Sequence, residues 1–218
     1  MNIEELEQIA LKSHNGQLEF SDEKPNPFNG IARLEERLGI NVKQRRDQIR
    51  RHYPNEPIIA AELGCFNATV VAEMQYIGGI EAFGIDKKPY LNRLLELPAR
   101  RLIVADLNCM PQIPDNTFHY MLSFNTLSYT DITKSFPEIF RVLKPGGVAD
   151  LDLEFWPEYI GRLEQSLLYP QLMVASTRSD YRAKVEEFFR DIEKVKEESP
   201  ELVGFFCYST RLEMAKPI

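Results

Sequence analysis

From Pro57 onward, short apolar runs alternate with stretches of helical spacing, and this alternation restricts the fold more than any other feature of the chain. The apolar runs predict strands at residues 58–63, 80–85, 101–105, 119–124 and 148–153. The stretches between them predict helices at 68–76, 90–97 and 136–143, the last with Pro137 acceptable only in its first turn. Neighbouring parallel strands need such crossover connections, so the pattern predicts a doubly wound α/β fold with a mostly parallel sheet.

Segments on both sides of this core have a different character. Residues 1–56 are polar and of helical spacing, broken at SDEKPNPFNG, and predict an N-terminal helical cap. Trp156 to Ser199 predicts a helical insertion, and Leu202–Tyr208 and Leu212–Ala215 predict two closing strands that form a hairpin on the sheet edge. We therefore expect a seven-stranded sheet with an antiparallel last strand in a single domain. Its parts are the cap (1–56), the core (57–153), the insertion (154–200) and the closing strands (201–218).

Composition narrows the class of partner. The 218 residues suit one domain, and 44% hydrophobic with 27% charged residues is the balance of a globular chain. The formal net charge of −7 argues against nucleic acid and anionic membranes as partners and favours small molecules, while the oligomeric state stays open. The cap carries a basic cluster, for which a solvated helix face and an arginine contact to a ligand carboxylate are both open: Lys43, Arg45, Arg46, Arg50, Arg51 and His52.

Location and metal content are predicted from what the sequence lacks. The N-terminus shows no secretory signal, and no apolar run approaches the roughly 20 residues of a membrane span, so we expect a cytoplasmic protein. Cys65, Cys109 and Cys207 are not at metal-ligand spacing, which argues against a zinc or disulfide framework and for a reducing compartment. We expect no metal site.

Polar residues follow several of the predicted strands, and in an open parallel sheet ligands bind beyond these carboxyl ends. Glu62 and Gly64 end the first strand, and the glycine permits a tight turn and close approach of a ligand. Asp86 ends the second strand, where a carboxylate can accept hydrogen bonds from both hydroxyls of a ribose; capping the next helix is the alternative. Asp106 ends the third and can accept from an exocyclic amine, although an isolated aspartate there is more often a turn residue.

These residues carry a resemblance to a known family. The ordered set ELGCFNA, FGID, ADL, IPDNTFHYMLSFNTLSY and EIFRVLKPGG resembles the class I S-adenosylmethionine-dependent methyltransferases, especially their small-molecule branch, over roughly Pro57 to Leu153. The resemblance implies a Rossmann-like fold and S-adenosylmethionine as cofactor. It also implies site residues: Glu62, Gly64, Cys65 and Phe66 around the methionine part, Asp86 at the ribose, Asp106 and Leu107 at the adenine, and Asn125 beside the sulfonium.

The opening turn departs from the family pattern, which usually has glycines at the positions of Phe66 and Ala68. We expect Phe66 to be tolerated, because this cofactor has no pyrophosphate that needs backbone clearance. The methyl group of Ala68 is expected to narrow the methionine pocket by about an ångström without closing it.

The predicted reaction is transfer of a methyl group to a small-molecule acceptor by in-line displacement, which depends mainly on alignment of the reactants. Tyr129 is the candidate catalytic residue, orienting or deprotonating the acceptor, with a packing role as the alternative. Two other classes stay open. One is a catalytically degenerate methyltransferase fold that acts as a binding or regulatory protein; the other is a nicotinamide-dependent enzyme, disfavoured because Phe66 would crowd a pyrophosphate.

Overall fold

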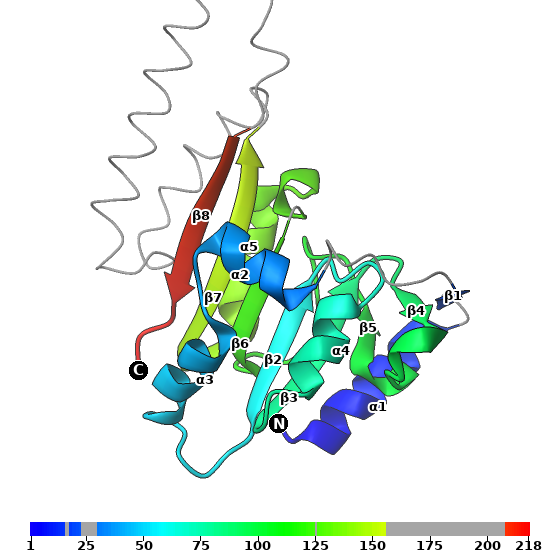
Figure 1. Cartoon of the computed structure of the whole chain (residues 1–218), viewed down its shortest axis with the longest axis horizontal. Coiled ribbons are helices and arrows are strands. Elements are labelled where there is room, and N and C mark those ends of the chain that lie inside the picture. The colour runs from blue at the N-terminus through cyan, green and yellow to red at the C-terminus, as the bar shows by residue number, and fades with distance from the viewer. Residues whose placement is uncertain (16–17, 23–29, 125, 156–207) are drawn as a thin grey trace, which may run out of the picture.

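The computed structural model describes residues 1–15, 18–22, 30–124, 126–155 and 208–218 of the chain. Within them the main sheet has six strands in the order β5-β3-β2-β6-β7-β8, of which only β8 is antiparallel to its neighbour (Figure 1). The strands are β2 (Ile58–Leu63), β3 (Ile80–Asp86), β5 (Leu102–Val104), β6 (Phe118–Ser123), β7 (Leu143–Phe155) and β8 (Tyr208–Ala215). The predicted mostly parallel sheet with an antiparallel last strand is confirmed.

Helices cover both faces of the sheet, as a doubly wound fold requires. On one face, α1 (Ile3–His14) and α5 (Ile132–Val142) pack into one hydrophobic cluster with residues of β2, β3 and β6. On the other, α2 (Ile31–Leu38), α3 (Val42–Arg50) and α4 (Thr69–Gln75) pack into a second cluster against the same strands. Alternate residues of β2 explain the division, since Ile59 and Ala61 belong to the first cluster and Ile58 and Ala60 to the second.

The predicted helix at 90–97 is wrong. Tyr90–Asn92 forms a short strand, β4, that pairs in parallel with β1 (Glu19–Ser21), and only Arg93–Leu95 turns as a 3₁₀ helix, η2. The pairing partner lies about 70 residues earlier in the chain, so local spacing carried no sign of it. Two further 3₁₀ turns, η3 (Ala99–Arg101) and η4 (Leu127–Tyr129), complete the connections.

The predicted hairpin near the C-terminus is also wrong where the structure describes it. β8 runs without a turn from Tyr208 to Ala215 and pairs with β7 along its whole length. The turn expected between Tyr208 and Leu212 is therefore absent. Most of the predicted strand Leu202–Tyr208, the insertion Trp156 to Ser199 and Cys207 lie outside the described residues.

Two boundaries differ from the prediction around EIFRVLKPGG. Helix α5 begins at Ile132 rather than 136, because the carbonyl of Asp131 accepts the N–H groups of Lys134 and Ser135, and Pro137 therefore lies in the helix interior. Strand β7 begins at Leu143, five residues early, and its register with β6 shifts between Leu143 and Val148. The irregular stretch contains Gly146 at φ +76°, a conformation that favours glycine.

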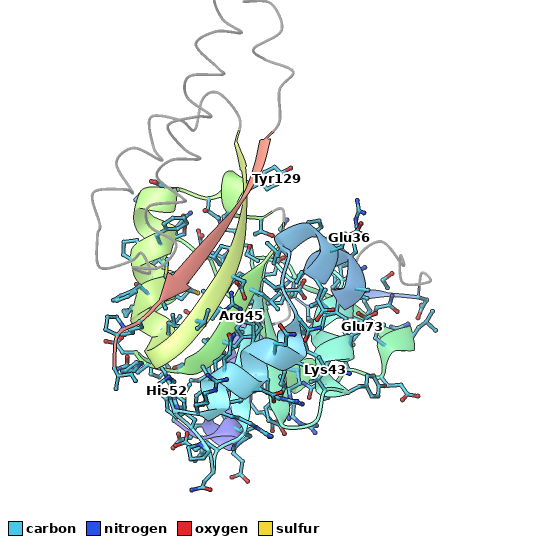
Figure 2. All side chains as sticks on the ribbon, turned by 60° about the vertical axis from the view of Figure 1, so that its left-hand side comes forward. Glu36, Lys43, Arg45, His52, Glu73 and Tyr129 are labelled. Carbon is cyan, nitrogen blue, oxygen red and sulfur yellow. The ribbon has the colours of Figure 1, made fainter. Side chains whose placement is uncertain are left out.

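The N-terminal helices occupy separate places rather than one cap. α1 packs at the β5 edge of the sheet, and α2 lies beside α4, near the carboxyl ends of the strands (Figure 1). In α3, Arg45 turns inward to a protein carboxylate (Figure 2). The next residue, Arg46, pairs with the exposed Asp47. None of the described helices is long and apolar enough to cross a membrane.

Candidate cofactor site

A crevice opens at the carboxyl ends of β2, β3, β5 and β6 and consists of two adjoining cavities of about 370 and 150 Å³. Gly64, Asp86, Thr126 and Tyr129 line both cavities, so the two form one continuous site. Register explains the convergence, because Leu63 pairs with Ile85 and Ser123, which brings the residues after these strands to one edge of the sheet.

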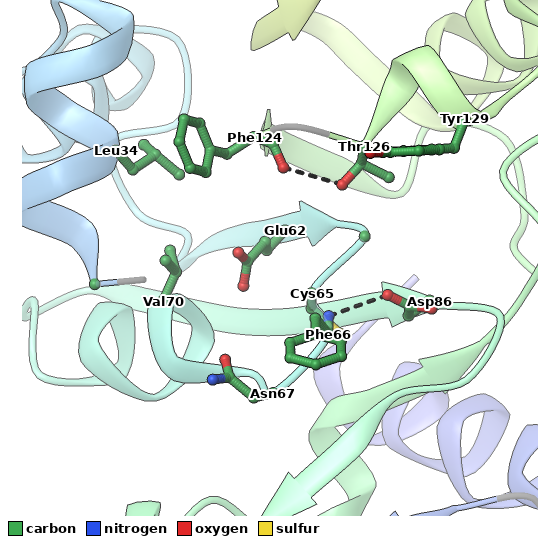
Figure 3. A pocket seen from close by; sticks show the side chains of 12 residues that line it. Leu34, Glu62, Cys65, Phe66, Asn67, Val70, Asp86, Phe124, Thr126 and Tyr129 are labelled. Carbon is green, nitrogen blue, oxygen red and sulfur yellow. Dashed lines mark hydrogen bonds between the residues drawn. The ribbon is translucent and has the colours of Figure 1, made fainter. Parts of the chain in front are cut away.

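The crevice brings together the predicted site residues that the structure describes. The larger cavity is lined by Glu62, Gly64, Cys65, Phe66, Asp86 and Tyr129 (Figure 3). The smaller cavity adds Asp106 and Leu107. Asn125 lies outside the described residues, and the binding roles of all these side chains stay predictions.

Glycine is required at position 64 for two reasons. Its φ is +72°, and a Cβ atom built there would lie 2.1 Å from the Thr126 Oγ1 atom. Its N–H donates to the carbonyl of Ile85 at 2.7 Å, which fixes the turn against β3. The backbone of the turn therefore lies against Thr126 in the segment after β6, and both residues line the crevice.

Phe66 and Ala68 adopt the left-handed conformation with φ of 41° and 58°. The Phe66 ring is 57% exposed and lies 5.2 Å from the Tyr90 ring at the rim of the cavity rather than across it (Figure 3). The expectation that the Ala68 methyl group narrows the pocket is wrong, because Ala68 is fully buried in the second hydrophobic cluster and lines neither cavity. Neither residue closes the crevice.

Glu62 is the buried acid of the site, with only 8% of its surface exposed. Burial raises the pKa of Glu62 well above its ordinary value, outweighing a hydrogen bond from the backbone N–H of Val71. Its Oε2 atom is buried without a hydrogen-bond partner among the described residues, although the side chain lines the larger cavity. An unpaired buried oxygen beside a cavity is a place for a ligand donor.

Asp86 holds the turn with both carboxylate oxygens. Oδ2 accepts the N–H of Phe66 at 3.0 Å, and Oδ1 accepts the N–H of Lys88 at 2.9 Å (Figure 3). The predicted alternative, a cap for a helix near Pro89, is not what the structure shows, because the next segment is the strand β4. Each carboxylate oxygen has further lone pairs, so the side chain can still accept from a ligand that enters the crevice.

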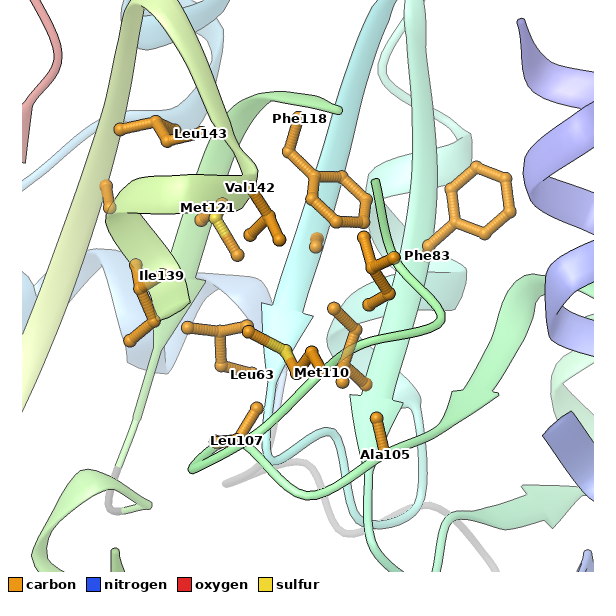
Figure 4. Packing of buried hydrophobic residues seen from close by; sticks show 14 of the residues in the cluster. Leu63, Phe83, Ala105, Leu107, Met110, Phe118, Met121, Ile139, Val142 and Leu143 are labelled. Carbon is orange, nitrogen blue, oxygen red and sulfur yellow. The ribbon is translucent and has the colours of Figure 1, made fainter. Parts of the chain in front are cut away.

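Asp106 and Leu107 form the wall of the smaller cavity. The Asp106 carboxylate pairs with Lys87 at 2.8 Å and accepts the N–H of Asn108 at 3.0 Å. Partial burial alone would raise the pKa of Asp106, but these two contacts outweigh it and lower the pKa. Leu107 is anchored in the first hydrophobic cluster beside Leu63 and Met110, so this wall rests on the core (Figure 4).

Tyr129 lies in η4, and 75% of its surface is exposed in the part of the chain that the structure describes. Within that part, Tyr129 does not have the packing role that the sequence left open as an alternative. Other lining residues were not predicted as site residues: Gly30, Leu34, Asn67, Val70, Phe124 and Thr126. Phe124 and Thr126 belong to the polar segment after β6 and were within reach of sequence reasoning. Gly30 and Leu34 come from α2, and no local pattern placed that helix at the crevice.

Comparison with known proteins finds one family that is similar to part of the core. Residues 61–149 match the family model described as a methyltransferase domain. This range begins in β2 and ends in β7, and it contains every described lining residue except Gly30 and Leu34. No curated protein is similar enough to the chain to count as a match.

Solved structures show low similarity. The Haemonchus contortus phosphoethanolamine N-methyltransferase 2, solved with S-adenosyl-L-methionine, is 16% identical over 80% of this chain, with a TM-score of 0.49. This chain spans about half of that protein, 52% of its length. A proposed S-adenosyl-L-methionine-dependent methyltransferase of Methanococcus maripaludis is 14% identical over 91% of this chain and 98% of its own, with a TM-score of 0.45. No activity or substrate is transferred from either.

Over residues 61–149 the chain is therefore similar to the methyltransferase domain family, and this range contains most of the residues that line the crevice.

Proposed function

We propose that the chain is an S-adenosylmethionine-dependent methyltransferase that transfers a methyl group to a small-molecule acceptor by in-line displacement. One observation carries the proposal. Acidic residues at or after the carboxyl ends of β2, β3 and β5, namely Glu62, Asp86 and Asp106, line one continuous crevice in the domain that matches the methyltransferase family.

The residues present fit this cofactor. The unpaired Oε2 of Glu62 offers an acceptor for the ammonium group of the methionine part, and Gly64 places the backbone of the turn in the cavity wall. A cavity of about 370 Å³ falls in the size range of small-molecule sites. Phe66 and Ala68, the two departures from the family pattern, both leave that space open.

Each of the described side chains has a separate role in this proposal. Asp86 accepts hydrogen bonds from the ribose hydroxyls, and Asp106 and Leu107 meet the adenine. When bound, S-adenosylmethionine supplies an electrophilic methyl group on a sulfonium. Tyr129, at the boundary of both cavities, orients the acceptor through its hydroxyl group.

The charge of the larger cavity indicates the class of acceptor. Its described lining includes the carboxyl groups of Glu62 and Asp86 but no lysine, arginine or histidine. Leu34, Val70 and Phe124 supply apolar wall. We therefore propose an uncharged or positively charged acceptor with an apolar part, since the Asp86 carboxylate would repel an anion and the described lining of the larger cavity holds no cation.

Calorimetric titration of the chain with S-adenosylmethionine and S-adenosylhomocysteine tests the proposal. We expect micromolar binding that Asp86→Ala weakens at least about tenfold, because hydrogen bonds to a charged group are lost. Asp47→Ala is the matched control, since it removes the same charge from an exposed position on α3 and should leave binding unchanged. If neither ligand binds at millimolar concentration, the proposal fails and the degenerate, non-catalytic fold takes its place.

A further inference from the structure

Helix α2 lacks an N-terminal cap of its own. Its N-cap residue is Gly30, which has no side chain to accept a hydrogen bond, and no acidic residue occupies its first turn. Glu73 of α4 takes over this function, because its Oε2 atom accepts the N–H of Ile31 at 2.5 Å. A carboxylate at a helix N-terminus also interacts favourably with the helix dipole. Figure 2 shows Glu73 on the side of the molecule where α2 lies.

The Glu73 carboxylate occupies the space where a side chain at position 30 would begin. A Cβ atom built on Gly30 would lie 2.8 and 3.0 Å from the two carboxylate oxygens of Glu73. The φ of Gly30 is −86°, a value open to any residue, so a side chain at this position would have to displace only the flexible end of Glu73.

This contact joins two walls of the larger cavity. Gly30 and Leu34 bring α2 to the cavity, and Val70, one turn before Glu73, brings α4. Helix α4 follows directly after the turn that contains Gly64 and Phe66. The Glu73 carboxylate thus connects the helix that follows the cofactor turn with the neighbouring helix α2, which also contributes to the cavity wall.

We infer that Glu73 is a positioning residue that holds the N-terminus of α2 against the crevice and so sets the width of its methionine end. The inference rests on the proposed function for the identity of the ligand. Glu73 itself lines neither cavity, so it acts through the placement of Gly30 and Leu34.

The experiment compares Glu73→Ala with Glu73→Gln, whose amide oxygen can still accept from Ile31, and with Glu35→Ala. Glu35 is a matched control because it caps the neighbouring helix α3, accepting the N–H of Val42 at 2.7 Å, and lines neither cavity. Dissociation constants are measured for S-adenosylhomocysteine and for methylthioadenosine, which lacks the amino-acid end. Hydrogen exchange of the α2 amides is measured without ligand.

We expect Glu73→Ala to weaken S-adenosylhomocysteine about tenfold and methylthioadenosine less than about twofold. Glu73→Gln should recover most of the loss, and Glu35→Ala should change neither constant. Exchange should accelerate in α2 and not in α3 of the Glu73→Ala variant. Equal weakening of both ligands, unchanged S-adenosylhomocysteine binding, or unchanged exchange in α2 overturns the inference.

The exchange measurement also separates this inference from the proposed function. If the unmodified chain binds neither ligand, the proposed function fails. The response of α2 to Glu73→Ala then still shows whether the carboxylate holds this helix.

Discussion

The turn between β2 and α4 contains three residues at positive φ, namely Gly64, Phe66 and Ala68. For residues with a side chain this conformation costs roughly 1–2 kcal/mol each. The surrounding contacts must therefore hold the turn in place, and these include the hydrogen bonds of Asp86 to Phe66 and of Asn67 to Thr69. At the residue scale, the shape of the site depends on contacts more than on local preference.

Gly64→Ala is expected to destabilise the fold by about 2–4 kcal/mol, because the new methyl group would overlap Thr126 in addition to the strain at φ +72°. Urea denaturation measures the loss. Thr126→Gly removes the atoms that would collide, so the double variant should recover the steric part and keep the strain. If Thr126→Gly recovers nothing, the overlap is not the cause.

Glu62→Gln is expected to raise stability at pH 7 by about 1–3 kcal/mol, because the buried acid no longer has to stay protonated. The pKa of Glu62 is raised in the folded state, so the unfolded chain loses this proton first, and stability falls as the pH rises above about 4.5. The advantage of the variant should therefore vanish towards pH 4. Urea denaturation across this pH range measures it. Glu36→Gln, at an exposed position, should give no gain in stability over the unmodified chain at any pH of the series. An advantage of Glu62→Gln that is constant with pH would contradict the prediction.

The residues of the site that lie at or after the end of a strand could be predicted from the sequence, because the carboxyl ends of parallel strands lie at the same edge of the sheet. Glu62, Asp86 and Asp106 were found in this way. The contribution of Gly30 could not be, since it depends on Glu73 from a helix more than 40 residues later. The same limit applies to the inward direction of the Ala68 side chain, which tertiary packing decides.

At the scale of elements, α3 is held to the sheet by a buried ion pair. Arg45 donates to both carboxylate oxygens of Asp150 at 2.8 Å, and Asp150 is fully buried and also accepts from the Tyr120 hydroxyl. The sequence left two interpretations of the basic cluster open, a solvated helix face and a contact to a ligand. Neither applies to Arg45. Its partner is a carboxylate of the protein itself.

Arg45→Ala is expected to cost about 3–5 kcal/mol in urea denaturation, because it leaves a buried carboxylate without its cation. Arg45→Met combined with Asp150→Leu should recover at least half of that loss, since no charge is then buried. Arg33→Ala breaks an exposed pair with Glu36 and serves as control, with an expected loss below about 0.5 kcal/mol. A loss of that small size for Arg45→Ala would mean that the pair contributes little.

Helix or strand could be predicted from the sequence wherever the spacing of hydrophobic residues determines the structure, as in β2, β3 and β6. The prediction failed where a pairing partner distant in sequence or a backbone hydrogen bond determines it. Tyr90–Asn92 is a strand only because β1 lies beside it, and α5 continues through Pro137 because Asp131 starts the helix earlier. The segment from Tyr208 to Leu212 stays extended because β7 offers it a full edge to pair with.

At the scale of the whole molecule, a polar cluster lies at the end of the sheet opposite the crevice. His119 is buried at the start of β6; its Nδ1 accepts the N–H of Ile59 at 3.0 Å, and its Nε2 lies 3.0 Å from the Lys144 Nζ and 3.4 Å from Glu56. Burial, helped by the charge of Lys144, lowers the pKa of His119 to about 4. The cluster therefore ties β2, β6 and β7 together in the neutral form of the imidazole.

Stability should rise with pH between about 4 and 6.5 because of His119, since the unfolded chain binds a proton in this range that the folded chain does not. His119→Asn keeps an acceptor for the Ile59 N–H but removes the imidazole that titrates. The rise of the free energy of unfolding with pH should therefore become smaller. Urea denaturation at intervals of pH measures it. Glu62 has the opposite effect above pH 4.5, so the comparison is best made in the Glu62→Gln background; an unchanged slope there would contradict the role of His119.

The order of the sheet has a consequence for the time course of folding. β2 and β6 pair through Ala60 and Tyr120 only after the chain between them has closed a long loop, which makes such pairing slow. The crevice that Gly64 and Thr126 both line does not exist until that step is complete. A ligand bound in the crevice should therefore lower the rate of unfolding and leave the rate of refolding unchanged.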